Sequence, residues 1–410
     1  MVFVGGLIMV EIGEEEVVSL EDMADGMSEV KRHAPNKKDD KKEIKKESNE
    51  KPKQKKSKVH KAVVAFFIVA LVAAIGVLGY VTVVFGNIPF VVKWRNIWIE
   101  TAMTTDQHKW LATSFFPDWL IDDVMSRQVD IKDITVTDIY GEQSEDILGQ
   151  SKLVVGEKDK FGNVVFANDI EEGVVILEIK ETNFVGKLVL IDDPSRVRLA
   201  TTDYKGSRGE FVCDYLEKEN AVVGINASGF QDKGGVSLGG TLVGLCVSGG
   251  EYWGTYSSKY TLVGFDDKDR LVVGGIEDWD EYNIRDGFQY RPSLILNGEK
   301  VVEDSAGWGL QPRTVVGQCE NGVVLFLVAD GRQVGYSIGA TMEDCADILL
   351  QYGAVTAGAC DGGSSSVIGY NGEVINKPSA RNMPTGRYLP NAWIVERKTT
   401  EKTETTENAQ

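Results

Sequence analysis

One uncharged stretch, residues 62–85, constrains this chain more than any other part of its sequence. Its residues, AVVAFFIVALVAAIGVLGYVTVVF, include no Asp, Glu, Lys or Arg. As a helix rising ~1.5 Å per residue, a segment of this length spans roughly 36 Å, which exceeds the ~30 Å hydrocarbon core of a bilayer. We therefore expect one transmembrane helix over residues 61–86.

The charges beside this stretch predict its orientation. Residues 31–61 contain 14 Lys or Arg and five Asp or Glu, whereas no comparable basic run follows the stretch. The positive-inside rule then places residues 1–60 in the cytoplasm and the C-terminal domain outside the cell. A cleaved signal peptide is the alternative, but the apolar core is too long for one and no A-x-A-like cleavage site follows. A single-pass protein of the cell membrane is the prediction.

Both ends of the chain have the composition of disordered segments. Residues 1–30 contain eight acidic residues and no basic residue, and residues 398–410, KTTEKTETTENAQ, are polar. Met1 and Met9 are both candidates for the initiator. We expect a disordered cytoplasmic tail over residues 1–60 and a second disordered tail over residues 398–410.

The composition of the exterior excludes several functions. Residues 62–410 contain 49 acidic and 30 basic residues, so they lack the basic surface that nucleic-acid binding needs. No G-x-x-x-x-G-K-[ST] or G-x-G-x-x-G motif follows a predicted strand, so no nucleotide cofactor is expected. The five cysteines show no C-x-x-C spacing, which predicts buried thiols rather than disulfides or a zinc site.

Residues 151–397 show the pattern of a β-rich domain. Short β-branched runs such as RTVVGQ and GVVLFLVAD alternate with turn residues. One helix is predicted to begin after Thr341, with Asp344 at the capping-box position and Gly353 at its end, and a second is predicted in GEFVCDYLEKEN. These elements predict an α+β fold around a mixed or antiparallel sheet.

Residues 87–150 are predicted to form a helical stalk between the membrane and this domain. TTDQHKWLATSFF and PDWLIDDVMSR both have helical patterns, the second beginning at Pro117. Trp94, Trp98, Trp110 and Trp119 gather here, and they fit either a membrane interface or packing against the domain.

The positions of the histidines limit the acid–base chemistry. The chain has three, His33, His60 and His108, and none lies in residues 152–397. A Ser-His-Asp triad and a His-ligated zinc site are therefore excluded within the domain. We expect its acid–base chemistry to come from carboxylates, Tyr, Lys or bound water.

Four motifs place polar side chains where predicted strands end. NASGF, PRTVVG, ADGR and ACDGGSSSV contribute Asn226, Arg313, Asp330 with Arg332, and Asp361. Strand ends backed by a rigid sheet are good positions for a binding site. Each motif alone also fits an ordinary turn, because Gly, Asp, Asn and Ser all favour turns.

In this order, the motifs resemble those of the phosphodiester glycosidase family, which includes N-acetylglucosamine-1-phosphodiester α-N-acetylglucosaminidase and bacterial proteins of exopolysaccharide biosynthesis. The family pattern N-[GA]-[GS]-F, P-R-[TS]-x-x-G, D-G-R, D-G-G-x-S-S and R-x-x-x-N-A corresponds here to NASGF, PRTVVG, DGR, DGGSSS and RYLPNA. Ser228 stands where glycine is common. The resemblance covers about residues 150–397 and does not include the apolar stretch.

The resemblance implies hydrolysis of a sugar from a phosphodiester, here in a cell-envelope polysaccharide or a teichoic-acid-like polymer. A phosphodiester leaves readily, so a strong general acid is less necessary than in other glycosidases. Arg313 and Arg332 are the candidates for binding the phosphate. Asp361 is the candidate for the carboxylate that activates water or attacks the sugar, and Asp330 for its partner or for a ligand of a divalent cation.

The remaining candidates for substrate binding are Asn226, Gly362, Gly363, Ser364 and Ser365. The amides of residues 362–364 are expected to form an anion-binding nest. The sequence leaves open the sugar, the leaving group, any metal requirement and the oligomeric state. A non-catalytic module that binds envelope polysaccharide uses the same kinds of side chain and is the alternative function.

Overall fold

A computed structural model of the chain describes residues 55–105, 108–128, 133–139, 146–232, 236–380 and 382–399. The two expected tails therefore fall almost entirely outside the described residues. The contacts within the chain divide it into two units, residues 1–70 and 71–410. Helix α1 (Lys55–Phe85) contains the uncharged stretch, and its residues His60–Phe85 are long and apolar enough to cross a membrane.

Three short helices follow α1, and only one of them begins where the sequence predicts. They are α2 (Pro89–Met103), α3 (Trp110–Thr113) and α4 (Asp118–Met125). The helix expected over residues 104–116 is reduced to the single turn of α3. Helix α4 begins directly after Pro117, whose fixed φ of −69° suits a helix start. The three helices enclose a small core of their own that includes Ile99 and Val124.

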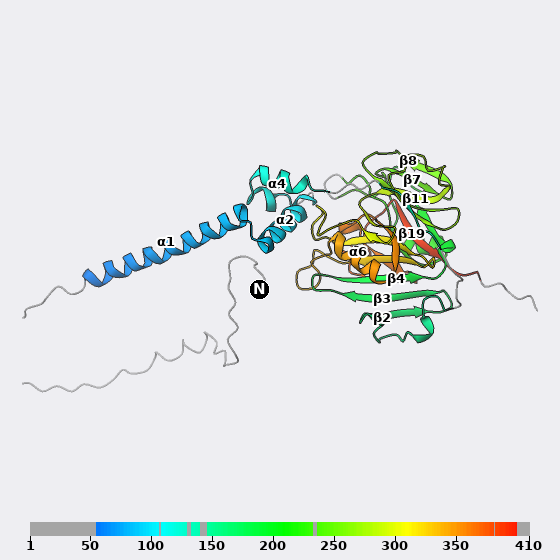
Figure 1. The fold of residues 1–410 in the computed structure, drawn as a ribbon, viewed down its shortest axis with the longest axis horizontal. Helices are drawn as coiled ribbons and strands as arrows, with labels where there is room; N and C mark the ends of the chain where they lie inside the picture. Colours follow the sequence, from blue (N-terminus) through cyan, green and yellow to red (C-terminus); the bar gives the residue numbers. More distant parts are fainter. Residues whose placement is uncertain are drawn as a thin grey trace, which may run out of the picture. The chain divides into compact units, whose positions relative to one another are not determined.

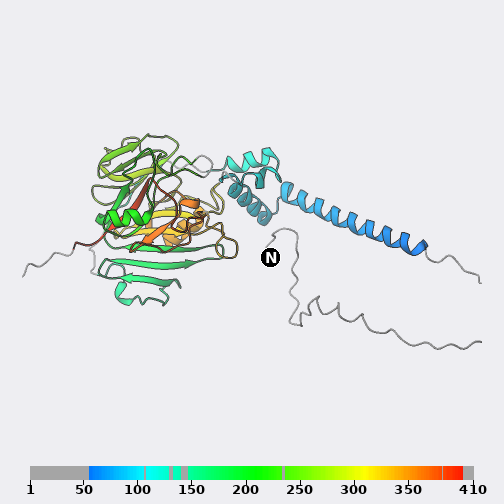
Figure 2. The same cartoon turned by 180° about the vertical axis from the view of Figure 1, so that it is seen from behind.

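The rest of the described chain forms three sheets in which every paired strand is antiparallel (Figures 1 and 2). The first sheet has the order β13 (Glu299–Lys300), β12 (Ser293–Leu296), β16 (Ala354–Ala359), β14 (Arg313–Cys319), β15 (Val324–Ala329), β4 (Val185–Ile191), β3 (Val174–Lys180), β2 (Val164–Asp169). The second has the order β18 (Glu373–Val374), β17 (Ile368–Tyr370), β6 (Ala221–Asn226), β19 (Asn391–Glu396), β5 (Val197–Thr201). The third has the order β1 (Thr135–Val136), β10 (Leu271–Gly274), β9 (Thr261–Asp266), β11 (Ile284–Tyr290), β7 (Leu245–Ser248), β8 (Glu251–Gly254).

The continuous apolar run of β15 reflects burial of both faces of the first sheet. Its alternate residues Val324, Phe326 and Val328 enter a core shared with the other two sheets. The residues between them, such as Leu325 and Leu327, enter a second core beneath α6. Because side chains alternate along a strand, a strand between two cores needs no polar positions.

Two helices of the domain match the sequence prediction. Helix α6 (Met342–Gln351) begins after Thr341, whose hydroxyl accepts from the Asp344 amide while the Asp344 carboxylate accepts from the Thr341 amide. Helix α5 (Val212–Lys218), green in Figure 2, lies in the second expected helical region and packs against the second sheet through Val212 and Leu216. The α+β prediction is therefore confirmed.

The antiparallel pairing brings three of the motifs together at one end of the inner strands β16, β14 and β15 of the first sheet. Arg313, at the start of β14, pairs with Ala329 at the end of β15. Val315 of β14 pairs with Ala359 at the end of β16. The segments that hold Arg313, Asp330 and Asp361 therefore lie side by side, as rigid strand ends.

Candidate functional site

A cavity of about 590 Å³ lies beside these strand ends. Its wall includes the turn of residues 361–365, the charged side chains of Asp232, Arg332 and Arg387, and the ring of Phe230. Residues Thr104, Thr105 and His108, between α2 and α3, form another part of the wall. The cavity thus combines carboxylates and arginines from separate parts of the chain, which is the kind of pocket that holds a charged ligand.

Asp361 lies in the cavity wall, immediately after β16, and is held from several sides. Its carboxylate Oδ1 accepts a hydrogen bond of 2.8 Å from the Tyr290 hydroxyl, and its amide donates to the Ala227 carbonyl at 2.8 Å. Its own carbonyl accepts from Asn226 Nδ2 at 2.6 Å. These contacts fix both the backbone and one carboxylate oxygen of Asp361.

Burial raises the pKa of Asp361 above its ordinary value of 3.8. Hydrogen bonds from Ser365 and Tyr290, together with the positive charge of Arg387, act in the opposite direction. The pKa of the Tyr290 hydroxyl is also raised, chiefly by burial and further by the charge of Asp361, so Tyr290 keeps its proton and remains a donor. A carboxylate with a raised pKa is a stronger base than an exposed aspartate.

Asn226 holds the backbone of Asp361 in place from outside the cavity. Its side chain is fully buried and does not line the cavity. Besides the bond to Asp361, its Oδ1 accepts from the Thr314 hydroxyl and from the Val367 amide, at 2.7 and 3.1 Å. Asn226 therefore joins the ends of β6, β14 and the DGGSSS turn, which is a positioning role.

Gly363 is needed for the shape of the DGGSSS turn. It has a φ of +65°, and a Cβ built on it lies 2.9 Å from Arg332 Nη2. Its amide donates to the Pro312 carbonyl at 2.9 Å. The sequence predicted that the amides of residues 362–364 form an anion-binding nest, but the Gly363 amide is already bonded to this carbonyl. Gly362, Gly363, Ser364 and Ser365 all line the cavity.

Arg332 reaches the cavity as expected. Its backbone has the left-handed φ of +59°, which is unusual for a residue with a side chain and marks a functional candidate. Its Nε donates to Gln311 Oε1 at 2.7 Å. Burial lowers the pKa of the guanidinium and the charge of Asp361 opposes this effect, so Arg332 remains the cation that faces Asp361.

Arg387 is a second cavity arginine, and the sequence reasoning did not select it. It lies in the RYLPNA motif, where its place in the family pattern was the available signal. Its guanidinium pairs with Asp232, donates to Ser364 Oγ at 3.3 Å, and lies 4.9 Å from the centre of the Phe230 ring. Burial opposes ionisation of Asp232, but the bond from Arg387 holds the pKa of that carboxyl below its ordinary value.

Arg313 and Asp330 do not line the cavity in the part of the chain that the structure describes. Arg313 is only 5% exposed, and it donates to the carbonyls of Ala340, Trp308 and Gly309. Asp330 is 3% exposed. Its carboxylate accepts hydrogen bonds from the Tyr336 hydroxyl, the Asn376 side-chain amide and the Lys377 backbone amide. Both side chains hold loops together.

His108, from outside the histidine-free domain, lies in the wall of the cavity. The domain of residues 152–397 lacks histidine, but the cavity wall also includes the exposed His108, which precedes α3. Sequence spacing gave no signal for this, because Asp361 lies more than 250 residues further along the chain. Among the described residues, no group of three or more His, Cys, Asp or Glu side chains is arranged to hold a metal ion.

Comparison with known proteins supports the resemblance that the motifs predict. A family model described as phosphodiester glycosidase matches residues 219–396. The SPbeta prophage-derived protein YomE of Bacillus subtilis (strain 168), described as uncharacterized, is 30% identical over 193 residues. The match covers 44% of this chain and 29% of YomE, so the chain spans less than a third of the length of that relative.

Two solved structures are similar at lower identity. The catalytic domain of zebrafish N-acetylglucosamine-1-phosphodiester α-N-acetylglucosaminidase, auto-inhibited by its pro-peptide, has a TM-score of 0.44 at 18% identity, covering 60% of this chain and 87% of that one. A hypothetical protein from Synechocystis has a TM-score of 0.40 at 16% identity, covering 55% of this chain and 62% of that one.

Proposed function

We propose that this chain, whose residues 219–396 belong to the phosphodiester glycosidase family, hydrolyses the bond between a sugar's anomeric carbon and a phosphodiester oxygen. The observation that carries the proposal is the cavity in which Asp361 shares one wall with Arg332 and Arg387. Hydrolysis of a glycosyl phosphodiester needs both kinds of group, since one end of the substrate becomes cationic while the other is an anion.

Arg332 and Arg387 bind the phosphate. Both line the cavity, and a guanidinium donates to two oxyanion oxygens at once. Residues 151–397 contain more acidic than basic residues, so the net charge of the domain repels a phosphate. Binding a phosphate therefore requires arginines placed at the site. We assign no phosphate contact to Arg313, because it does not line the cavity and its Nε and Nη2 donate to backbone carbonyls.

Asp361 is the catalytic carboxylate. It either deprotonates the attacking water or bonds to the anomeric carbon before water replaces it. In both cases the C–O bond to the phosphate breaks with its electron pair on the phosphate oxygen. Water supplies the hydroxyl of the free sugar, and the other product is a phosphate monoester. Tyr290 fixes the carboxylate oxygen through its 2.8 Å bond, and Asn226 fixes the backbone.

Turnover tests this proposal against a binding-only function. The purified chain is incubated with an α- or β-glycosyl methyl phosphodiester and with the matching methyl glycoside, which lacks the phosphate. We expect release of free sugar from the phosphodiester alone. Saturable binding of the phosphodiester with no sugar release for any sugar tested contradicts the proposal and favours the envelope-polysaccharide binding module.

We also propose that α1 anchors the chain in a cell membrane with residues 1–60 in the cytoplasm, so that the substrate is an envelope glycan. The support is the length and apolar composition of His60–Phe85 and the basic run before it. Protease added to intact cells should remove the C-terminal domain and leave the N-terminal 60 residues protected. Protection of the domain instead contradicts this orientation.

A further inference from the structure

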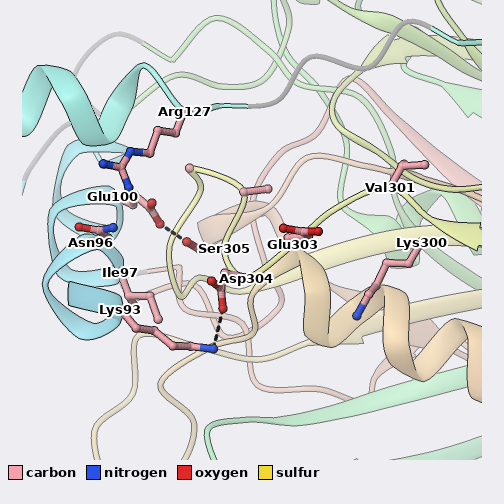
Figure 3. A pocket seen from close by; sticks show the side chains of 12 residues that line it. Lys93, Asn96, Ile97, Glu100, Arg127, Lys300, Val301, Glu303, Asp304 and Ser305 are labelled. Atoms are coloured by element: carbon pink, nitrogen blue, oxygen red, sulfur yellow. Dashed lines mark hydrogen bonds and ion pairs between the residues drawn. The ribbon is translucent and has the colours of Figure 1, made fainter. Parts of the chain in front are cut away.

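Helix α2 is attached to the loop of residues 301–312, which connects β13 to β14. Figure 3 shows the pocket between them, with Lys93 of α2 paired to Asp304 and Glu100 of α2 bonded to Ser305. Glu100 is 4% exposed, and burial raises its pKa while the Ser305 hydrogen bond opposes that effect. This buried contact holds α2 firmly on the loop.

The same attachment continues to the catalytic cavity through Gln311. This side chain is 3% exposed, and its Nε2 donates to the Thr101 carbonyl and to Thr104 Oγ1, at 3.0 and 3.2 Å. Its Oε1 accepts from Arg332 Nε at 2.7 Å. One amide group therefore binds the end of α2 on one side and Arg332 on the other, which links the position of the Arg332 side chain to that of α2.

We propose that Thr104, Thr105 and His108 are a functional part of the catalytic cavity: Gln311 positions Arg332 against the end of α2, and His108 forms the wall that contacts the leaving group. Thr104, Thr105 and His108 line the same cavity as Asp361, although they lie outside residues 219–396 that define the family match. This inference rests on the proposed function, since it names groups that act on the same phosphodiester.

Variants of two glutamines, Gln311 and Gln128, distinguish a role in positioning Arg332 from a role in attaching the helices to the loop. Gln128 Nε2 donates to the Gly307 carbonyl, so it also ties the helical region to the loop but makes no contact with Arg332. Gln311→Leu should lower kcat/KM about ten- to hundredfold, the range for a lost hydrogen bond to a charged group, whereas Gln128→Leu should remain near wild type. Gln311→Glu keeps an acceptor for Arg332 but loses the donor to the Thr101 carbonyl, so its kcat/KM should lie between those of Gln311→Leu and wild type.

The measurement is kcat and KM of the full chain in detergent on a glycosyl phosphodiester, with a melting curve for each variant. Equal kcat/KM for Gln311→Leu and Gln128→Leu, or equal losses in Gln311→Glu and Gln311→Leu, overturns the positioning role. If Gln311→Leu does not fold, Gln311→Met, which also lacks the acceptor for Arg332, takes its place in both comparisons. Absence of wild-type turnover contradicts the proposed function instead, which keeps the two failures distinct.

His108 is tested by the size of the leaving group. His108→Ala should raise KM several-fold more for a phosphodiester with a long leaving group, such as a polyol phosphate, than for the methyl phosphodiester. Equal effects on both substrates, or no effect on either, overturns the assignment of His108 to the leaving-group wall. His108 is exposed, and substitutions of exposed residues usually leave stability unchanged, so His108→Ala should melt at the wild-type temperature.

A separate observation concerns the exposed aromatic side chains of this helical region. Phe90, Trp94 and Trp98 follow one another at i, i+4 and i+8 on α2, and they are 71%, 42% and 48% exposed. Trp98 continues the row to Phe115, with ring centres 6.1 Å apart. The exposure of Trp94 and Trp98 favours the membrane interface over packing against the domain, the two alternatives that the sequence left open.

We infer that this aromatic row lies in the headgroup region of the bilayer. Only residues 86–88 separate α1 from α2, and Arg95 Nη1 donates to the carbonyls of Val83 and Val84, which ties α2 to the end of the apolar helix. Tryptophan favours the membrane–water interface because its ring is apolar and its N–H is polar. The row is continuous with the proposed membrane span, and the bilayer surface is its partner.

Brominated lipids, which quench nearby indoles, test this surface in nanodiscs that contain the full chain. The double variant Trp94→Phe, Trp98→Phe should lose a large part of the quenchable fluorescence. The control Trp393→Phe, in the domain core, should lose none of it. An unchanged quenchable fraction in the double variant overturns the inference, whereas failure of the chain to enter nanodiscs contradicts the membrane anchor itself.

Discussion

Replacing Asp361 by Asn tests the catalytic site with little change in shape. The amide of residue 361 continues to donate to Ala227, and its carbonyl continues to accept from Asn226. The Asn side-chain oxygen can still accept from Tyr290, but it lacks the charge that makes this bond strong. We expect the free energy of unfolding to change by about 1 kcal/mol or less, since the weaker bond is offset by removal of a buried charge.

The effect on catalysis should be much larger. A residue that acts as general base or nucleophile contributes roughly a hundredfold or more to the rate, which corresponds to at least about 2.7 kcal/mol of activation free energy. The assay is release of sugar from a glycosyl phosphodiester, with a melting curve measured beside it. Activity within about threefold of wild type, with an unchanged melting temperature, refutes the catalytic role of Asp361.

The stability of the same variant should depend on pH in a defined direction. Because burial raises the folded-state pKa of Asp361 above 3.8, the protonated carboxyl stabilises the fold below that value. This contribution is lost as the pH rises through the folded-state pKa. The Asn variant has no such loss, so its melting temperature should gain on that of wild type between about pH 3 and pH 7. A difference that is constant over this range contradicts the raised pKa.

Three further substitutions separate cavity residues from scaffold residues. Arg387→Lys should lower kcat/KM by about tenfold or more with a small change in melting temperature, because lysine lacks the planar fork; near-normal kinetics would remove Arg387 from the phosphate site. Gly363→Ala should lower activity and cost about 1–2 kcal/mol of stability, because its φ is +65° and its Cβ meets Arg332; an unaffected variant would show that the turn adapts. Arg313→Lys should lower the unfolding free energy by about 1–3 kcal/mol, because three backbone carbonyls lose their donor, and kcat of the folded enzyme should change little; the reverse pattern would return Arg313 to the site.

Local sequence patterns predicted those parts of the fold that depend on local physics. The capping box of Thr341 and Asp344 specifies the start of α6, and Pro117 specifies the start of α4. The α+β class followed from the short β-branched runs. The order of the strands in three sheets did not follow, because it depends on pairing between residues far apart, such as Thr135 with Val273.

The site could be predicted by position but not by orientation. The motifs identified the strand ends that meet at the cavity, and Asp361 and Arg332 both line it. Nothing in the sequence of ADGR or PRTVVG distinguishes a side chain that faces the cavity from one that faces backbone carbonyls, as Asp330 and Arg313 do toward their surrounding loops. His108 and Gln311 depend on how a separate helix docks, which no local pattern encodes.

The bond that is broken provides the most direct test of the central claim. A glycosyl phosphodiester is hydrolysed by the full chain in water enriched in oxygen-18, and both products are analysed by mass spectrometry. If Asp361 directs water to the anomeric carbon, the label enters the free sugar and the phosphate monoester remains unlabelled. Label in the phosphate monoester would show attack at phosphorus and would contradict the assignment of the site as a glycosidase.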